Sequence, residues 1–151
     1  MAKDCRVAIL SEASLGRVMQ HIIGKKSVKS WGVVTAYRWD KTPKQNREAN
    51  KELGKKIRAM GLGFFELEGH WQECQDKNVN YFDCPKSQLV DSTEISLFVP
   101  NIGIKQIHKL GNDYTQDSVL YGGEDTKGNG VLVYKNGRVE SVGQFHPDNM
   151  Q

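Results

Sequence analysis

The sequence predicts a fold of the α+β class. Two segments show the 3.6-residue apolar period of amphipathic helices, and each lies between segments that have the composition or alternation of β-strands. With a first helix and a last hairpin set aside, the elements follow the order β-α-β-β-α-β. This order is that of the ferredoxin-like fold, an antiparallel sheet of four strands with both helices on one face. An Asn-Gly turn near the C-terminus adds the hairpin.

Residues 1–30 are expected to form an N-terminal helix followed by a basic linker. Gly24 suits the end of this helix, and Lys25–Ser30 is the linker. The apolar stripe of the helix consists of Leu15, Val18, Met19, Ile22 and Ile23.

The first strand of the core is predicted at Trp31–Arg38, which is rich in valine, threonine and aromatic residues. A helix follows, since Thr42 fits an N-cap, Pro43 the first helical position and Gln45 the partner residue of a capping box. Gly61 suits its end. The expected buried stripe is Ala49, Leu53, Ile57 and Met60.

The second and third strands are predicted at Phe64–Glu73, which alternates in polarity, and at Glu94–Val99. Residues 78–91 lack a period and contain Pro85, so this stretch is expected to be a loop or insertion.

A short helix that buries Ile104, Ile107 and Leu110 follows the third strand, and a fourth strand is predicted at Ser118–Tyr121. The last hairpin joins Val131–Tyr134 to Arg138–Val142. The core domain is therefore expected over residues 31–143, with a flexible tail at 144–151.

The composition, 38% hydrophobic and 26% charged over 151 residues, is that of one ordinary globular domain. No apolar run can span a membrane, and no secretory signal begins the chain. Three cysteines are too few for a disulfide framework, so we expect reduced thiols and a cytoplasmic location.

The net charge of +3 makes nucleic acid an improbable partner, but the charges are unevenly distributed. Residues 25–58 contain eleven basic and three acidic residues, whereas residues 61–100 contain seven acidic and two basic ones. This asymmetry is typical of a solvated helix face; the alternative is a surface that steers an anionic partner.

Standard catalytic motifs are absent from the sequence. His70, Cys74 and Cys84 match no standard zinc spacing and lack a fourth ligand, so no metal site is expected. The glycine-rich stretch Gly122–Gly130 fits either a strand connection or a phosphate-binding loop.

Polar residues gather where the predicted strands begin and end. In the ferredoxin-like fold these ends come close together within one subunit or across a subunit boundary, so the set indicates either a binding site or a series of unrelated caps. The set is Tyr37, Arg38, Asn46, Glu73, Glu94, Gln116 and Asp117.

Several short motifs occur in a common order over roughly residues 31–134. They are Thr35-Ala36-Tyr37-Arg38 with Asn46 eight residues after the arginine, Gly69-His70-Trp71-Gln72-Glu73, Glu94 before Ile95–Val99, and Gln116-Asp117-Ser118-Val119-Leu120 followed by Val131–Tyr134. This order resembles that of the phage S-adenosylmethionine (SAM) lyases, formerly called SAM hydrolases. The sequence departs from the family at Trp71, where a tyrosine is expected, and in a longer stretch at 74–92, whose Tyr81 is a candidate for the missing hydroxyl.

The resemblance implies a lyase that converts SAM into 5′-methylthioadenosine and L-homoserine lactone through attack of the substrate's own carboxylate on Cγ. It implies no cofactor and a role in phage evasion of host restriction-modification. The open face of the predicted ferredoxin-like sheet separately indicates a homo-oligomer, with a trimer favoured for this topology. Glu94 and Trp71 are the expected catalytic residues. The expected substrate-binding residues are Tyr37, Arg38, Asn46, Glu73, Gln116 and Asp117.

Three alternatives remain at this stage. The first is a trimeric PII-like regulatory protein that binds a nucleotide without catalysis. The second is a bacterial family without an assigned activity that shares the Thr-Ala-Tyr, Glu-x-Ser and Gln-Asp signals. The third is a single-stranded RNA binder, which the absence of the RNA-recognition aromatic motif and the acidic residues Glu66, Glu68 and Glu73 disfavour.

Overall fold

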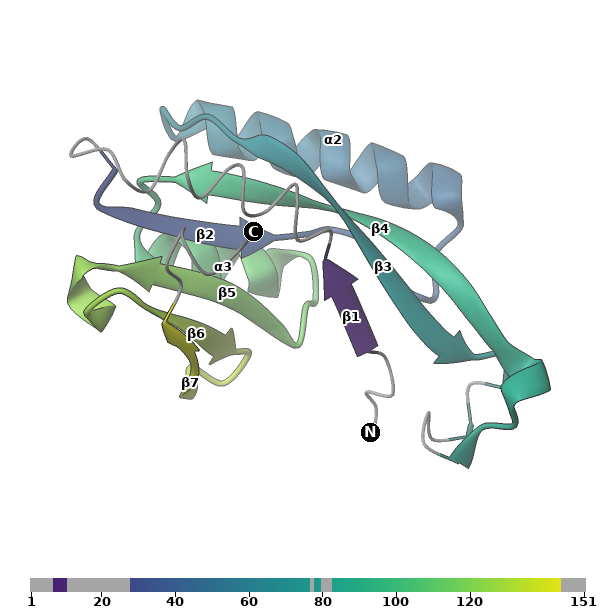
Figure 1. The fold of residues 1–151 in the computed structure, drawn as a ribbon. Coiled ribbons are helices and arrows are strands. Elements are labelled where there is room, and N and C mark those ends of the chain that lie inside the picture. The colour runs from purple at the N-terminus through teal and green to yellow at the C-terminus, as the bar shows by residue number, and fades with distance from the viewer. Residues whose placement is uncertain (1–6, 11–27, 77, 80–82, 145–151) are drawn as a thin grey trace.

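The computed structural model describes residues 7–10, 28–76, 78–79 and 83–144. Over these residues the chain forms one antiparallel sheet with the strand order β1-β3-β4-β2-β5-β6-β7, together with helices α2 and α3 (Figure 1). The elements are β1 Val7–Leu10, β2 Ser30–Val34, α2 Pro43–Ala59, β3 Phe65–Cys74, η3 Lys86–Gln88, β4 Leu89–Pro100, α3 Ile104–Asp113, β5 Ser118–Gly123, η4 Glu124–Thr126, β6 Asn129–Tyr134 and β7 Val139–Gln144.

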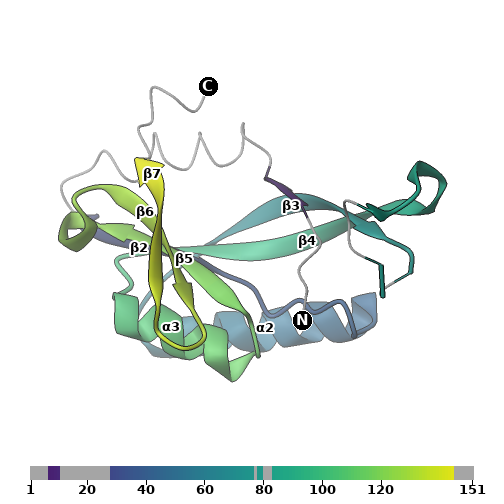
Figure 2. The same cartoon turned by 90° about the horizontal axis from the view of Figure 1, so that it is seen from below.

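The ferredoxin-like prediction is confirmed. The order β2-α2-β3-β4-α3-β5 in the chain and β3-β4-β2-β5 in the sheet are those of two interleaved β-α-β units. Both described helices cover the same face, so the other face of the sheet, called the helix-free face below, has no helix among the residues that the structure describes (Figure 2). The β6–β7 hairpin extends the sheet beyond β5, and Gly137 in its turn has a φ of 91°, as the Asn-Gly signal predicts.

Three strands differ from the sequence-based expectation. β2 is shorter, because its pairing with β4 ends at Val34 opposite Leu97. β4 begins at Leu89, inside the stretch expected to be a loop. β1 was not predicted; it pairs with β3 from Val7 opposite Gln72 to Leu10 opposite Gly69. The expected helix at 15–23 and the tail after residue 144 lie outside the described residues.

Helix α2 begins with the predicted capping box. The Thr42 hydroxyl accepts a hydrogen bond from the Gln45 backbone N–H at 3.1 Å, and the Gln45 side chain accepts one from the Thr42 N–H at 3.0 Å. The helix ends at Met60, followed by Gly61 with a φ of 81°, a conformation that glycine adopts without steric cost. The capping box therefore satisfies two backbone N–H groups at the start of the helix, those of Thr42 and Gln45.

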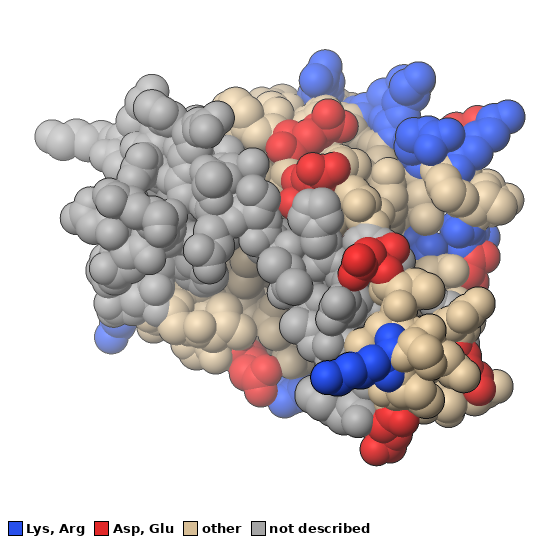
Figure 3. All heavy atoms as spheres, turned by 45° about the vertical axis from the view of Figure 1, so that its right-hand side comes forward, with Lys and Arg blue, Asp and Glu red and all other residues tan. Residues whose placement is uncertain are grey.

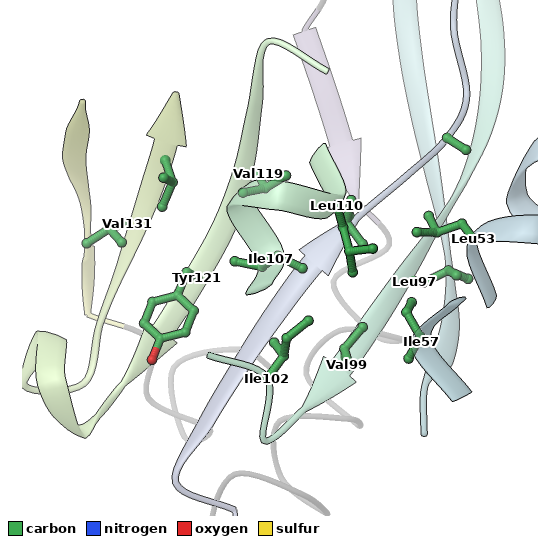
Figure 4. Close-up of a cluster of buried hydrophobic side chains, with 13 residues drawn as sticks. Leu53, Ile57, Leu97, Val99, Ile102, Ile107, Leu110, Val119, Tyr121 and Val131 are labelled. Carbon is green, nitrogen blue, oxygen red and sulfur yellow. The ribbon is translucent and has the colours of Figure 1, made fainter. Parts of the chain in front are cut away.

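The core lies between the two helices and the sheet (Figure 4). Leu53 and Ile57 from α2 and Ile107 from α3 have no exposed surface. They pack against apolar side chains of the strands, and each such buried side chain contributes about 1.5–3 kcal/mol relative to an exposed one. The remaining fully or nearly buried members are Val34, Ala36, Leu97, Val99, Ile102, Leu110, Val119, Tyr121, Val131 and Val133.

The exposed face of α2 accounts for the uneven charge distribution. Its cations gather along one side of the molecule (Figure 3), and two of them lie over aromatic rings, Lys56 over Tyr114 and Arg58 over Phe64. Lys56 also pairs with Glu52 at 3.7 Å. The exposed basic residues of this face are Lys44, Arg47, Lys51, Lys55, Lys56 and Arg58. Among the helices described, none is long and apolar enough to cross a membrane.

The expectation of reduced cysteines is wrong for two of the three. Cys74, at the end of β3, and Cys84 form a disulfide with 5.8 Å between their Cα atoms. Their separation of ten residues in the chain gave no sign of this, because the long β3–β4 hairpin brings them together. The two sulfur atoms are therefore not available as the zinc ligands considered for them with His70, and no cluster of three or more metal-binding side chains occurs among the described residues.

Candidate active site

Glu94 lies on the helix-free face of the sheet. Residues alternate between the two faces of a strand, and Leu97 and Val99 of β4 belong to the core below the sheet. Glu94 therefore points to the opposite side, where its strand partner is Gly69. Only 7% of Glu94 is exposed, so this carboxylate is held out of bulk water at a fixed position.

The same face carries an aromatic pair. Phe98, also on β4, is fully buried, and its ring stacks on that of Trp31 with 5.6 Å between centroids and an interplanar angle of 12°. Trp31 is held against the sheet, because a Cβ on Gly122 of the neighbouring strand would lie only 2.5 Å from the indole ring. The aromatic pair is therefore a closely packed part of the same face, four residues along β4 from Glu94.

Tyr37 lies within the electrostatic field of Glu94. Burial raises the pKa of the Tyr37 hydroxyl above its ordinary value, the charge of Arg47 opposes this rise, and the carboxylates of Glu94 and Glu66 add to it. Ala36 belongs to the core, and Tyr37 follows it in the irregular segment after β2. The phenol consequently stays protonated at neutral pH and can donate a hydrogen bond near Glu94.

Buried amides hold the backbone around Tyr37. Asn46 accepts from the Arg38 N–H at 2.9 Å and donates to the Arg38 carbonyl at 3.1 Å. Gln116 donates to the Tyr37 carbonyl at 2.9 Å. Asn50 accepts from the Ala36 N–H at 2.9 Å and donates to the Ile95 carbonyl at 2.8 Å. These side chains fix the segment that follows β2, where pairing with β4 has ended.

The Arg38 side chain is directed toward the connection between α3 and β5. Its guanidinium donates to the Thr115 carbonyl and pairs with Asp40 at 3.1 Å. Asp117, nearby in the same connection, is exposed, and its carbonyl accepts from the Lys135 N–H at 3.0 Å. Arg38 and Asp117 therefore lie at the edge of the Tyr37 segment.

The model of the S-adenosylmethionine lyase family matches residues 32–151. The chain belongs to this family. The match begins in β2 and includes every described element after it, together with the C-terminal residues that the motif resemblance left out. Membership makes the protein a SAM-cleaving enzyme. No curated protein and no solved structure matches the chain.

In this lyase, the two remaining predicted residues lie on β3. Trp71 is opposite Ser92, two residues along β3 from the Gly69–Glu94 pair. Glu73 is opposite Val90, four residues from Gly69, which is roughly 13 Å along a strand. The structure brings the backbone of Trp71 near Glu94 and places Glu73 two residues farther along β3, away from Glu94.

Sequence reasoning missed Asn50. The signal was present, since Asn46 and Asn50 are four residues apart on the stripe of α2 that also carries Leu53 and Ile57. A polar residue on the buried face of a helix must find a hydrogen-bonding partner. Asn50 is therefore recognisable as a candidate from its position on the helix, although no motif contains it.

Proposed function

We propose that this lyase converts SAM into 5′-methylthioadenosine and L-homoserine lactone. The observation that carries this proposal is a buried carboxylate, Glu94, whose charge acts on the phenol of Tyr37, in a chain of the SAM lyase family. The site so formed combines one acceptor for a cation with one neutral donor.

The reaction proposed is intramolecular. A carboxylate oxygen of the substrate attacks its own Cγ, forming the ring C–O bond, while the Cγ–S bond breaks and its electron pair neutralises the sulfonium. No proton is transferred and no water is consumed, so the step requires neither an enzymatic nucleophile nor a metal-activated water. The enzyme's task is to fold the methionine moiety into a conformation in which the oxygen approaches Cγ in line with the leaving sulfur.

We assign Glu94 to the substrate's ammonium group. A carboxylate close to the sulfonium would stabilise the ground state more than the transition state, because the positive charge on sulfur disappears during the reaction. A carboxylate on the ammonium group keeps its interaction throughout and holds the chain bent. Exclusion of water from this face also weakens the solvation that separates carboxylate and sulfonium in solution.

The other candidate residues divide into two groups. Tyr37 is assigned to a hydrogen bond with the substrate, and Trp71 to packing on the adenine or the sulfonium, an attraction of the cation–π type. Asn46 and Gln116 act through the backbone of Arg38 and Tyr37, to which their amides already bond. Arg38, Asp117 and Glu73 are assigned to the outer part of the site.

The route is tested by incubation with SAM in oxygen-18-labelled water, followed by chromatography and mass spectrometry. We expect methylthioadenosine and homoserine lactone to appear together, with no label on the oxygen attached to Cγ. Direct hydrolysis would instead produce homoserine with the label in its hydroxyl group, and that result would exclude the intramolecular attack.

The same assay tests the role of Glu94. Glu94→Gln keeps the size of the side chain but removes its charge, and we expect kcat/KM to fall on the order of 100-fold, the loss typical of a misplaced reactant. Asp91→Asn is the matched control, since it makes the same charge change at an exposed position of the same strand and should leave turnover unchanged. Equal activity of the two variants would contradict the assignment of Glu94.

We also propose that the enzyme is a homo-oligomer, with a trimer favoured, and that it depletes the methyl donor of restriction-modification enzymes in a phage-infected host. The sheet's helix-free face and the family membership support this. Light scattering of the purified protein tests the oligomer, and a monomeric mass would contradict it.

Host DNA methylation should decline when the chain is expressed, and unaltered methylation would count against the biological role.

A further inference from the structure

Strands β2 and β4 stop pairing with each other where the candidate site begins. The β2–β4 ladder ends at Val34 opposite Leu97, although both chains continue beyond this pair. Continuing the register by two residues would place Ala36 opposite Ile95. The Asn101 N–H bonds to the Ser30 carbonyl at 2.7 Å, and opposite pairs of an antiparallel ladder are hydrogen-bonded alternately, so Ala36 and Ile95 would form a pair with a direct backbone hydrogen bond.

Asn50 occupies the place of that direct bond. Its Oδ1 accepts from the Ala36 N–H at 2.9 Å, and its Nδ2 donates to the Ile95 carbonyl at 2.8 Å. The side-chain carboxamide thus supplies the acceptor and the donor that the two backbone groups would otherwise have supplied to each other. Asn50 reaches them from the second turn of α2 and is 7% exposed.

Thr35 completes the arrangement. Its hydroxyl donates to the same Ile95 carbonyl at 2.8 Å and accepts from the Tyr37 N–H at 3.1 Å. A carbonyl oxygen has two lone pairs, so the donors from Thr35 and Asn50 fill the hydrogen-bonding capacity of Ile95. No capacity remains for the Ala36 N–H.

We propose that Asn50 is a wedge: its carboxamide, inserted between Ala36 and Ile95, holds the ends of β2 and β4 apart and sets the spacing between Tyr37 and Glu94. Tyr37 follows Ala36 and Glu94 precedes Ile95, so each candidate residue is one peptide away from a bond that Asn50 makes. The effect on catalysis rests on the proposed function; the effect on strand separation does not. Asn50 is a positioning residue, since it acts through the backbone.

The kinetic test compares Asn50→Ala and Asn50→Asp with Ile57→Val. The aspartate retains the acceptor for Ala36 but loses the donor to Ile95. Per folded enzyme, below the melting temperature, both Asn50 variants should lose kcat on the order of 100-fold with a smaller change in KM, because the reacting conformation is misplaced. Ile57→Val removes a methyl group from the core on the same helix and should remain within about twofold of wild type.

A structural readout separates this inference from the activity. In a crystal structure of Asn50→Ala, the Ala36 N–H should either bond directly to the Ile95 carbonyl or lose its protection from hydrogen exchange. An unchanged separation of residues 36 and 95 with an unchanged, protected Ala36 amide would overturn the wedge. Unchanged kcat in a variant whose strands have closed would overturn its role in the site. If wild type does not cleave SAM, the proposed function fails, and the structural readout alone decides the wedge.

Discussion

At the scale of single residues, Thr115 has an unusual backbone conformation beside the candidate site. Its φ is 58°, in the left-handed region, which β-branched residues rarely enter because their side chain crowds the backbone. Its carbonyl accepts a hydrogen bond from the Arg38 guanidinium. The strain is localised where the connection between α3 and β5 meets the segment that carries Tyr37.

Replacing Thr115 by glycine should stabilise the protein. The substitution removes the steric cost of the left-handed conformation, and part of this gain is offset by the greater freedom of glycine in the unfolded chain, so we expect about 1 kcal/mol in the free energy of unfolding. Urea denaturation measures it. Lys127→Gly is the matched control: its φ is 55°, but its side chain is unbranched at Cβ and the gain should be smaller. A lower free energy of unfolding for Thr115→Gly than for wild type would contradict the presence of backbone strain at Thr115.

At the scale of elements, α2 was the most predictable part of the molecule and the strand ends the least. The capping box and the apolar stripe are local patterns, so Thr42, Leu53 and Ile57 could be placed from the sequence. The extent of a strand depends on its neighbour: β4 is long because β3 pairs with it as far as Cys74 opposite Leu89. β1 is too short for a recognisable period: it has four residues, and its strand partner is β3.

The capping box predicts the stability of this helix. Thr42→Ala removes the acceptor for the Gln45 N–H and should lower the free energy of unfolding by about 1 kcal/mol, whereas Thr42→Ser keeps the acceptor and should cost much less. Urea denaturation of both variants measures the difference. Equal stability of the two would show that the cap is replaced by water.

At the scale of the whole molecule, the ionisation of tyrosines limits stability in alkali. Burial raises the pKa of Tyr121, whose hydroxyl donates to Asp125, to about 12. Burial also raises the pKa of Tyr37 and of Tyr114, and a hydrogen bond to Glu140 raises the pKa of Tyr134. Each group binds its proton more tightly in the folded chain than in the unfolded chain, where the pKa is about 10.

The free energy of unfolding should therefore be insensitive to these groups below pH 10 and should fall as the pH rises from 10 through 12. Urea denaturation at a series of alkaline pH values measures the fall. Tyr121→Phe removes a buried hydroxyl with a raised pKa. The free energy of unfolding of this variant should therefore decline less steeply over this pH range than that of wild type. A parallel decline in the variant would show that other groups dominate.

The whole molecule also shows which parts of the site sequence reasoning could reach. Tyr37, Glu94 and Gln116 belong to contiguous motifs, so they could be predicted as site residues, whereas Asn50 acts across 45 residues of chain on Ile95 and was overlooked. The pairing of Cys74 with Cys84 was missed for the same reason, because it follows from the long β3–β4 hairpin. Local patterns carry the family's motifs; the contacts that position them are formed by the assembled sheet.

The uneven charge of the two halves of the chain has a consequence for encounter with the substrate. SAM carries an ammonium, a sulfonium and one carboxylate, so it approaches as a cation. The basic face of α2 repels it, while exposed carboxylates of β3, Glu66 and Glu68, attract it toward the strands that hold Glu94. Dissolved salt weakens both fields, so it changes the rate of substrate capture while the bond-breaking step proceeds at an unaltered rate.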